Sequence, residues 1–449
     1  MKLYKYQEEI LNKVKDKSHV AFYMDMGTGK TFVGSEKMNQ LGARVNLLIC
    51  QKSKIKDWMQ HFKENYPGYH IYNMTDKTKA AKRSLEYGFW MNYRYATNIP
   101  SVLIINYELA FRRSELLDLY DFTLMLDESS MVQNEAAKRT KFVMKLAEQA
   151  KNVILLSGTP TGGKYENLWS QLHMLGWNIS KKMYYNNYII IEYLDAIGRS
   201  VPIVKGYKNV NHLKRKMSMY NCVFLKADEI LELPEQNFIK VNVDDTKWYR
   251  DFHKKSVISW VDDLDSEHRI VELIGSNSLT KMLYERQLAS MYNKNKYDAV
   301  KDLMNSTDEN LIIFYNFKDE LAQLKVLCDS MGKKYAVISG DDKSGLEIIN
   351  YSLNHNFQHR YIPNILLIQY QAGAMGLNLQ HYSRRILYFS LPLSSELFEQ
   401  SKKRIHRIGQ KDSCFYYILL ATNTIDEQIY KTLLKRQDYT LKLFERGDV

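Results

Sequence analysis

The chain has 449 residues, of which 45% are hydrophobic and 25% are charged. This composition is typical of a globular protein and excludes a disordered chain, and the length suits two domains rather than one. The 63 Lys and Arg residues against 51 Asp and Glu give a net charge of +12. That excess favours a polyanionic partner, although ordinary solubilising charge explains it equally well.

The sequence predicts a cytoplasmic protein with no membrane partner. No apolar run approaches the ~20 residues that a membrane span requires, and the N-terminal residues lack the apolar centre of a signal peptide. Lys, Asn, Ile and Tyr are abundant, with 33 Tyr, which suggests the AT-rich genome of a low-GC bacterium or one of its phages. The four cysteines show no C-x-x-C spacing, so we expect buried thiols at Cys50, Cys222, Cys328 and Cys414.

A glycine-rich stretch near the N-terminus is built to hold phosphates. Residues 1–15 predict an amphipathic helix and residues 20–23 a strand, and Met24-Asp25-Met26-Gly27-Thr28-Gly29-Lys30-Thr31 follows directly. Such a turn between a strand and a helix points backbone N–H groups and the helix dipole at a polyphosphate. Lys30 would reach the terminal phosphates and the Thr31 hydroxyl would ligate magnesium. Because Met24 stands where the full pattern has a glycine, a plain glycine turn is the alternative.

Apolar runs alternate with helical stretches through the first part of the chain. Strands are expected at residues 45–50, 101–108, 122–126 and 152–156. This alternation predicts a parallel sheet with helices on both faces, in which ligands bind at the carboxyl ends of the strands.

Two polar motifs follow these strands. Asp127-Glu128-Ser129-Ser130 offers one carboxylate, from Asp127, to hold magnesium and a second, from Glu128, to orient and deprotonate a water. Such a pair alone is usually a loop or a helix cap, but together with the phosphate loop it favours nucleotide hydrolysis. Ser157-Gly158-Thr159-Pro160 could couple the nucleotide site to a bound nucleic acid, and a polar turn is the alternative.

Residues 176–292 are rich in Tyr and Lys at helical spacing and predict a helical insertion. The interleaved aromatic and basic residues could line a nucleic-acid groove, but core aromatics with a solvated basic face explain them equally well. A second alternating region then predicts another parallel sheet, with strands at residues 310–315, 334–338, 364–368, 385–389 and 414–419.

The second sheet has no phosphate loop but carries two other motifs, at residues 371–379 and 400–410. In the latter, Arg404 and Arg407 are three residues apart and are expected on one face of a helix. Two guanidinium groups presented together suit the charge that develops on a transferred phosphoryl group, and a solvated basic face is the alternative.

Taken in order, these motifs resemble those of superfamily 2 helicases, and more narrowly those of the Swi/Snf family of helicase-like DNA translocases. The resemblance extends from Gln7, which is similar to the family's nucleotide-sensing glutamine, to about Gln437. Ser53 with Trp58 resembles the motif after the phosphate loop. The most specific matches are residues 376–379, residues 404–410 and the Thr-hydrophobic-acidic element at residues 424–429.

The resemblance implies an α/β protein with two RecA-like domains, at residues 1–175 and 293–449, joined by an insertion at residues 176–292 and clamping one ATP with Mg²⁺. The implied catalytic residues are Lys30, Asp127, Glu128, Arg404 and Arg407, with Thr31 and Asp127 on the metal. The implied nucleotide contacts are Gln7, Gly27, Thr28, Gly29, Lys30, Thr31, Gly376 and Gln400. The implied nucleic-acid contacts are Lys52, Ser53, Asn106, Tyr107, Ser157, Thr159, Ala372 and Asn378.

The expected function is therefore a monomeric, ATP-hydrolysing motor on double-stranded DNA, working in a bacterial cell or phage-infected host with a possible replication, recombination or nuclease partner. Two alternatives stay open: a strand-separating helicase on single-stranded or forked DNA, and a nucleotide-gated binding module with negligible turnover. Ser130 keeps the second alternative open, because it replaces the histidine that usually ends the acidic box.

Overall fold

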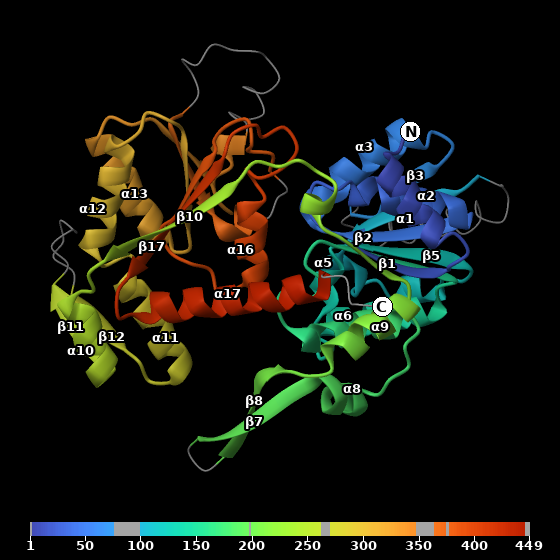
Figure 1. The fold of residues 1–449 in the computed structure, drawn as a ribbon, viewed down its shortest axis with the longest axis horizontal. Helices are drawn as coiled ribbons and strands as arrows, with labels where there is room; N and C mark the ends of the chain where they lie inside the picture. The colour runs from blue at the N-terminus through green and yellow to red at the C-terminus, as the bar shows by residue number, and fades with distance from the viewer. Residues whose placement is uncertain are drawn as a thin grey trace. The chain divides into compact units, whose positions relative to one another are not determined.

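The computed structural model describes residues 2–75, 99–196, 199–261, 270–346, 363–373 and 377–444. The chain forms two compact units, which we call the first unit (Met1–Leu231 with Arg436–Val449) and the second unit (Glu232–Lys435) (Figure 1). Each unit has its own parallel β-sheet, with a hydrophobic core on each face of that sheet.

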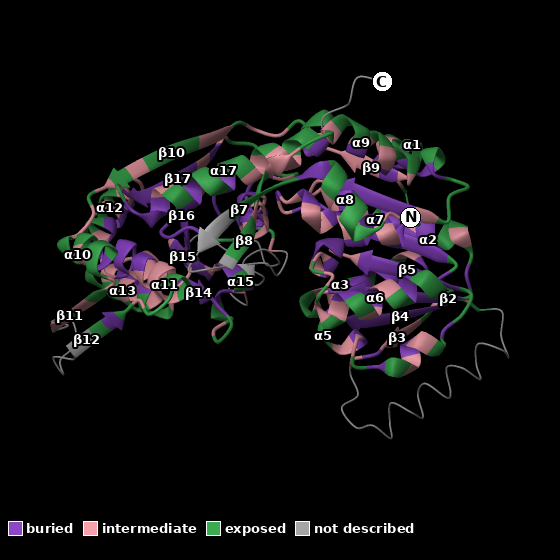
Figure 2. Cartoon of the chain, turned by 90° about the horizontal axis from the view of Figure 1, so that it is seen from below, coloured by how far each residue is buried: buried purple, intermediate pink, exposed green. Residues whose placement is uncertain are grey.

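The first unit is built on a parallel sheet, which has seven strands in the part of the chain that the structure describes, in the order β3-β4-β2-β5-β6-β1-β9. Its central strands are apolar and buried on both faces, as parallel strands covered by helices must be (Figure 2). The strands are β1 (His19–Met24), β2 (Val45–Cys50), β3 (His70–Asn73), β4 (Ser101–Asn106), β5 (Phe122–Asp127), β6 (Asn152–Ser157) and β9 (Cys222–Leu225).

Helices cover both faces of this sheet. Val20 and Phe22 of β1 face a core closed by α1 (Lys5–Lys13), α2 (Lys30–Leu41) and α3 (Ile55–Asn65). Ala21 and Tyr23 point to the opposite core, because successive strand residues alternate in direction. That second core is closed by α6 (Lys138–Gln149), α7 (Trp169–Met174), α8 (Lys181–Tyr188), α9 (Val210–Met219) and the end of α17 (Ile425–Phe444).

Several short elements complete the first unit. An antiparallel hairpin of β7 (Ile189–Ala196) and β8 (Arg199–Tyr207) projects from it (Figure 1). The others are one-turn helices, most of which follow a strand or precede a longer helix: η1 (Lys52–Lys54), α5 (Tyr107–Ala110), η2 (Ser114–Asp118), η3 (Ser129–Val132), η4 (Tyr165–Leu168) and η5 (Ala227–Glu229).

The second unit repeats the plan with a parallel sheet of six described strands, in the order β10-β17-β16-β13-β15-β14. These strands are β10 (Gln236–Val243), β13 (Leu311–Tyr315), β14 (Tyr335–Ile338), β15 (Ile365–Gln369), β16 (Arg385–Tyr388) and β17 (Cys414–Ala421). A separate antiparallel hairpin pairs β11 (Val257–Val261) with β12 (Ile270–Ile274).

The second sheet is also covered on both faces. One core contains side chains from α12 (Lys294–Asn305) and α13 (Lys318–Ser330). The other contains side chains from α10 (Lys247–Lys255), α11 (Ser278–Ala289), α15 (Tyr370–Gly373), α16 (Ser395–Lys402) and the first half of α17. Residues up to Lys435 of α17 belong to the second unit, and residues from Arg436 onward belong to the first.

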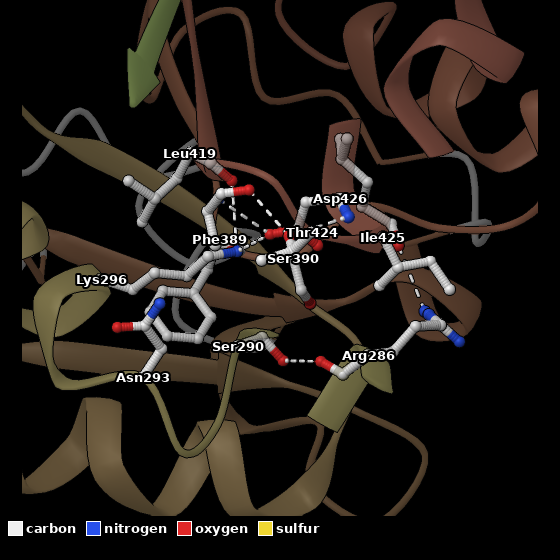
Figure 3. Close-up of polar contacts among 12 residues, drawn as sticks. Arg286, Ser290, Asn293, Lys296, Phe389, Ser390, Leu419, Thr424, Ile425 and Asp426 are labelled. Carbon is white, nitrogen blue, oxygen red and sulfur yellow. Dashed lines mark hydrogen bonds and ion pairs between the residues drawn. The ribbon is translucent and has the colours of Figure 1, made fainter. Parts of the chain in front are cut away.

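A buried polar cluster fixes the beginning of α17 to the second sheet (Figure 3). Lys296 of α12 is fully buried, and its ammonium forms an ion pair with Asp426 at 2.6 Å. The same Nζ donates to the carbonyl oxygens of Phe389 and Leu419, at 3.0 and 3.2 Å. The Asp426 carboxylate also accepts the backbone N–H of Ala421 at 3.2 Å. The carboxyl ends of β16 and β17 are thereby tied to α12 and α17.

The structure confirms the predicted fold class of two parallel-sheet α/β domains, and the predicted strands match β1, β2, β4–β6 and β13–β17 closely. The four cysteines are free and buried, as expected. Within the described residues, no helix is both long and apolar enough to span a membrane.

The expected helical insertion over residues 176–292 requires correction. The described part of this segment contains α8–α11 but also two hairpins, and it contributes β9 to the first sheet and β10 to the second. Ile189-Ile190-Ile191 and Val201-Pro202-Ile203-Val204 are rich in β-branched residues, which favour strands over helices, and Pro202 disfavours a helix further. The compact units meet in sequence at Leu231 and Glu232, inside the expected insertion.

Candidate functional site

The phosphate loop connects β1 to α2 in a conformation that needs glycine. Gly27 and Gly29 have φ angles of 82° and 79°. Gly29 directly precedes α2, so the amino end of this helix, with its positive dipole end, begins at the loop. A Cβ atom at Gly29 would lie 2.2 Å from Nε2 of Gln7, so the loop can approach α1 this closely only without a side chain there.

Lys30 lies across the loop. Its Nζ donates to the carbonyl oxygens of Met24, at 2.8 Å, and Asp25, at 3.1 Å. Because β1 and β6 are neighbours with Tyr23 opposite Ser157, the Ser157–Pro160 motif comes to the same place. A Cβ atom at Gly158 would lie 3.3 Å from the Lys30 Nζ and 3.4 Å from the Met24 oxygen. The predicted phosphate-binding lysine and coupling motif are thus in contact.

Gln7 reaches the loop from α1 and is only 2% exposed. Its Oε1 accepts the backbone N–H of Tyr4 at 3.0 Å, while its Nε2 donates to the Thr28 carbonyl at 3.4 Å. The hydroxyl of Tyr6 donates to the same carbonyl at 3.0 Å. In this structure the Gln7 amide therefore holds the loop against α1, and its predicted contact with a nucleotide stays a prediction.

The acidic box follows β5. Asp127 is the last residue of that strand, and its Oδ2 accepts a hydrogen bond of 2.7 Å from the indole Nε1 of Trp58. Burial raises the pKa of Asp127, against the Trp58 hydrogen bond and the charges of Lys30 and Lys54, which lower it. The charge of Lys30 therefore acts on the Asp127 carboxyl, although β6 separates β1 from β5.

The backbone at Glu128 is strained. Its φ and ψ angles of 55° and 60° lie in the left-handed region, which side chains other than Asn and Asp rarely adopt. The fully buried Tyr107 braces this turn, because its hydroxyl donates to the carbonyls of Asp127, at 2.9 Å, and Glu128, at 3.4 Å. The turn directs the chain from β5 into η3 with the two carboxylates adjacent.

The donor set suits Mg²⁺ bound together with a nucleotide. Among the described residues, no group of three or more His, Cys, Asp or Glu is arranged to hold a metal by itself. Magnesium, however, commonly binds through one or two carboxylates, a hydroxyl and the substrate's phosphates, and it keeps several waters. Thr31, the second residue of α2, and Asp127, at the end of β5, provide such oxygens at the carboxyl edge of one parallel sheet.

Some of the residues predicted to contact nucleic acid are exposed to solvent, and others are buried. Lys52 and Ser53 of η1 and Asn378 are exposed, and Thr159 is partly exposed. Asn106, Tyr107, Ser157 and Ala372 are buried. The Asn106 amide donates to Glu108 at 2.6 Å, and Ser157 Oγ accepts the Thr159 N–H at 3.2 Å. The buried four support neighbouring backbone or core in this structure, whereas the exposed ones are accessible to a ligand.

The arrangement of the two arginines differs from the prediction. α16 ends at Lys402, so Arg404 and Arg407 lie in the turns that follow it and do not share a helix face. Arg404 is buried, and its carbonyl accepts the N–H of Leu379 at 3.0 Å, which joins residues 377–379 to this turn. Burial lowers the pKa of Arg407. The physical reason for the difference lies in the backbone hydrogen bonds. The Arg404 N–H donates to the Ser401 carbonyl at 3.2 Å, as in a tighter turn, and the Arg404 carbonyl accepts Leu379 instead of a residue further along a helix.

Two further predicted nucleotide contacts lie in the second unit. Gln400 is on α16, where its side chain is buried and donates to Glu396 at 3.3 Å. Gly376 lies outside the described residues.

Sequence reasoning did not assign Trp58 or Tyr6 to the nucleotide site, and it gave Tyr107 a different role. Trp58 was noted only as part of a motif, although it lies with Ile55 and Phe62 on the buried face of α3. If the strand order had been known, Trp58 could have been placed at the site, because the helix that follows β2 should pack near the end of the neighbouring strand β5. The sequence alone does not give the strand order.

Comparison with known proteins places the chain in a family. Residues 9–294 match the SNF2-related domain, and residues 295–409 match the helicase conserved C-terminal domain. The Sulfolobus solfataricus SWI2/SNF2 ATPase core in complex with dsDNA is a similar solved structure, at 18% identity and a TM-score of 0.41, covering 98% of this chain and 92% of that one.

Curated relatives are longer than this chain. A SWI/SNF-related matrix-associated actin-dependent regulator of chromatin subfamily A-like protein 1 from Drosophila melanogaster is 22% identical over 97% of this chain and 55% of its own length. An uncharacterized ATP-dependent helicase from Mycoplasma pneumoniae is 24% identical over 93% of this chain and 39% of its own length. The chain thus spans about half the length of the relatives it matches. On the match over residues 9–294, which exceeds half of the chain, this protein belongs to the SNF2-related family of helicase-like ATPases.

Proposed function

We propose that the protein is a DNA-dependent ATPase that moves along double-stranded DNA. The observation that carries the proposal is the gathering of Lys30, Thr31, Asp127 and Glu128 at the carboxyl edge of the first sheet. A phosphate-binding loop and an acidic pair at this edge support nucleotide hydrolysis, since parallel sheets bind ligands there.

In this proposal, each site residue of the first unit has a separate role in ATP binding and hydrolysis. The Lys30 ammonium, which donates to two backbone carbonyls in this structure, would turn to the phosphates, for which a charged acceptor is the stronger partner. Thr31 and Asp127 would hold Mg²⁺, which neutralises charge on the phosphates when bound. Glu128 would accept a proton from the attacking water. The family resemblance gives Arg404 and Arg407 the task of stabilising charge on the transferred phosphoryl group, and this stays a prediction.

Exposed residues near the acidic box and the positive net charge of the chain support DNA as the polymer along which the protein moves. Lys52 and Ser53 are exposed on η1, which directly follows β2 at the same sheet edge as the acidic box. The net charge of +12 favours a polyanion, and contacts with phosphates carry no sequence information. Binding should therefore be tolerant of sequence and strongly weakened by salt. The predicted cytoplasmic location and a partner in replication, recombination or DNA cutting belong to the same proposal.

A triple-helix displacement assay tests movement on duplex DNA. The substrate is a long duplex with a labelled third strand bound near one end, and the control is Lys30→Ala. We expect ATP-dependent release of the third strand while both strands of the duplex stay paired. Release of a strand from a forked duplex, without third-strand release, would indicate a strand-separating helicase. Nucleotide-dependent DNA binding without either release would indicate a gated binding module.

A further inference from the structure

Trp58 stands between the segment expected to contact nucleic acid and the acidic box. β2 and β5 are neighbours in the first sheet, with Ile49 opposite Leu126, so the next residues along the two strands, Cys50 and Asp127, are also adjacent. The chain leaves β2 through η1 and enters α3, which carries Trp58. Lys52 on η1 is therefore separated from Trp58 only by the rest of η1 and the first turn of α3, and Trp58 contacts the end of β5.

The Trp58 ring is held rigidly by core packing. The side chain is only 2% exposed. It stacks on Phe62 at a centroid distance of 5.9 Å and meets the edge of His61 at 5.7 Å. Because the ring is fixed in this way, the direction of its N–H group is fixed as well, and that group donates to Asp127 Oδ2 at 2.7 Å.

A hydrogen bond of this kind orients a carboxylate. Groups that hydrogen-bond to metal ligands set the ligand's orientation and strongly affect metal affinity. The Asp127 carboxylate accepts the indole N–H on Oδ2 and also a hydrogen bond from the Glu128 backbone, so its orientation at the end of β5 is fixed. η1 adds an electrostatic contribution, because the charge of Lys54, which pairs with Asp57 at 2.8 Å, also acts on Asp127.

We propose that Trp58 is a positioning residue that orients the Asp127 carboxylate and links it to the Lys52–Lys54 turn. Nucleic acid bound at η1 would then shift α3 and, through the indole hydrogen bond, change the metal-binding geometry of the acidic box. This inference rests on the proposed function, because it assumes that Asp127 holds Mg²⁺ with a nucleotide.

Trp58→Phe tests the positioning role, with Trp169→Phe as the matched control. Both variants lose one indole hydrogen bond within the first unit, but Trp169 donates to the Ile179 carbonyl at 2.9 Å and not to the acidic box. The measurement is binding of a fluorescent ADP analogue as Mg²⁺ is titrated. We expect Trp58→Phe to raise the half-saturating Mg²⁺ concentration about tenfold or more. Binding in EDTA should stay unchanged, and Trp169→Phe should behave as the unaltered protein. An unaltered Mg²⁺ dependence in Trp58→Phe would overturn the proposal.

A spectroscopic measurement covers the case in which Trp58→Phe does not fold. Protein labelled with 5-fluorotryptophan has one ¹⁹F signal for each of its six Trp residues. We expect Mg²⁺ with ADP to shift one signal, and Asp127→Asn, which keeps the size of the side chain but removes the charged acceptor, to shift the same signal. If neither changes any tryptophan signal, the indole is not coupled to the metal site.

Stimulation of ATP hydrolysis by duplex DNA tests the link to η1. Trp58→Phe should reduce the ratio of rates with and without DNA, even at saturating Mg²⁺, and Trp169→Phe should not. An unchanged ratio in Trp58→Phe would overturn the link. If the unaltered protein hydrolyses no ATP with any nucleic acid, the proposed function fails, whereas the Mg²⁺ titration still decides the role of Trp58.

Discussion

Two lysines, one in each unit, donate to backbone carbonyls at the carboxyl edge of a parallel sheet. Lys30 donates to Met24 and Asp25 at the end of β1 and is partly exposed. Lys296 donates to Phe389 and Leu419 at the ends of β16 and β17, and it is fully buried and paired with Asp426. The same edge of the same kind of sheet thus carries the candidate nucleotide site in one unit and a buried ion-pair cluster in the other.

The difference lies in what surrounds each ammonium group. The carbonyls that Lys30 contacts are weak partners compared with a phosphate, so a bound polyphosphate would displace them readily. The Lys296 ammonium has a carboxylate and two carbonyls in a buried setting, where exchange for another partner would leave Asp426 without its cation. The second cluster fixes the beginning of α17, whereas the first is open to a ligand.

Substitution of Lys30 should have a larger effect on ATP hydrolysis than on stability, and this is the largest effect that we expect. Lys30→Ala should lower ATP hydrolysis by about a hundredfold or more, because a preorganised charge on the transferred phosphate is lost. Its free energy of unfolding should change by less than ~1 kcal/mol, since it loses only hydrogen bonds that are partly open to water. Steady-state hydrolysis and urea unfolding measure the two quantities. A variant that unfolds more easily while keeping its rate would contradict the assignment.

Lys296→Met should show the opposite pattern. Removal of one partner of a buried ion pair leaves an uncompensated charge and costs about 3–5 kcal/mol in the free energy of unfolding. Urea unfolding monitored by hydrogen exchange in β16 and β17 reports the second unit directly. The double variant Lys296→Met with Asp426→Asn, which removes the orphaned charge, should regain part of this loss. Additive losses in the double variant would mean that the ion pair is not the cause.

Gly29→Ala and Gly42→Ala form a matched pair in the first unit. Both glycines have positive φ angles, 79° and 64°, so each alanine should cost about 1 kcal/mol of stability. Only at Gly29 would the new Cβ meet a neighbour, Gln7, whereas nothing lies within 4 Å at Gly42. Nucleotide affinity, measured by calorimetry, should fall about tenfold in Gly29→Ala, or ~1.4 kcal/mol. Equal affinities in the two variants would show that the contact with Gln7 does not shape the loop.

The smallest effect concerns the amino end of the second sheet. Glu309 bonds to Arg384 Nε at 2.8 Å and to Arg385 Nε at 2.9 Å, and these hydrogen bonds lower its pKa from 4.5 to about 2. The pairing stabilises the fold above pH ~4.5, and its contribution is lost as the pH falls through about 2. Because the side chain is 38% exposed, Glu309→Gln should cost at most ~1 kcal/mol at pH 7.

The control for Glu309→Gln is Asp341→Asn, which breaks an exposed pair with Lys318. Thermal unfolding should show no change for Asp341→Asn at pH 7. For Glu309→Gln, the difference from the unaltered protein should shrink between pH 5 and pH 2. A difference that persists at pH 2 would assign the effect to packing rather than to charge.

The strands could be predicted from sequence because they are buried, apolar and short, as in β2 and β15. β9 and β10 could not, because β9 is an apolar run of only four residues and β10 is a largely exposed strand at a sheet edge, so their pairing comes from tertiary structure. The expectation of a helical insertion failed for the same reason: Tyr and Lys spacing does not distinguish a helix from a strand whose partner is unknown.

The candidate site was predictable where a single local motif defines it, as for Gly27 to Thr31 and for Asp127-Glu128. Contacts between motifs were not, because they depend on strand order. The Trp58–Asp127 hydrogen bond joins residues 69 positions apart, and the Tyr107 contact with the same turn requires β4 and β5 to flank β2. The turn after Lys402, which separates Arg404 from α16, includes a hydrogen bond from the N–H of Leu379, a residue of a different segment.

Steady-state ATP hydrolysis at low salt shows whether the protein is a DNA-dependent ATPase. The protein is assayed without nucleic acid and then with double-stranded DNA, single-stranded DNA or RNA, and Lys30→Ala is the blank. We expect stimulation mainly by double-stranded DNA, which high salt should suppress. A flat response equal to that of Lys30→Ala with every nucleic acid would contradict this expectation and would mean that the site binds nucleotide without driving movement.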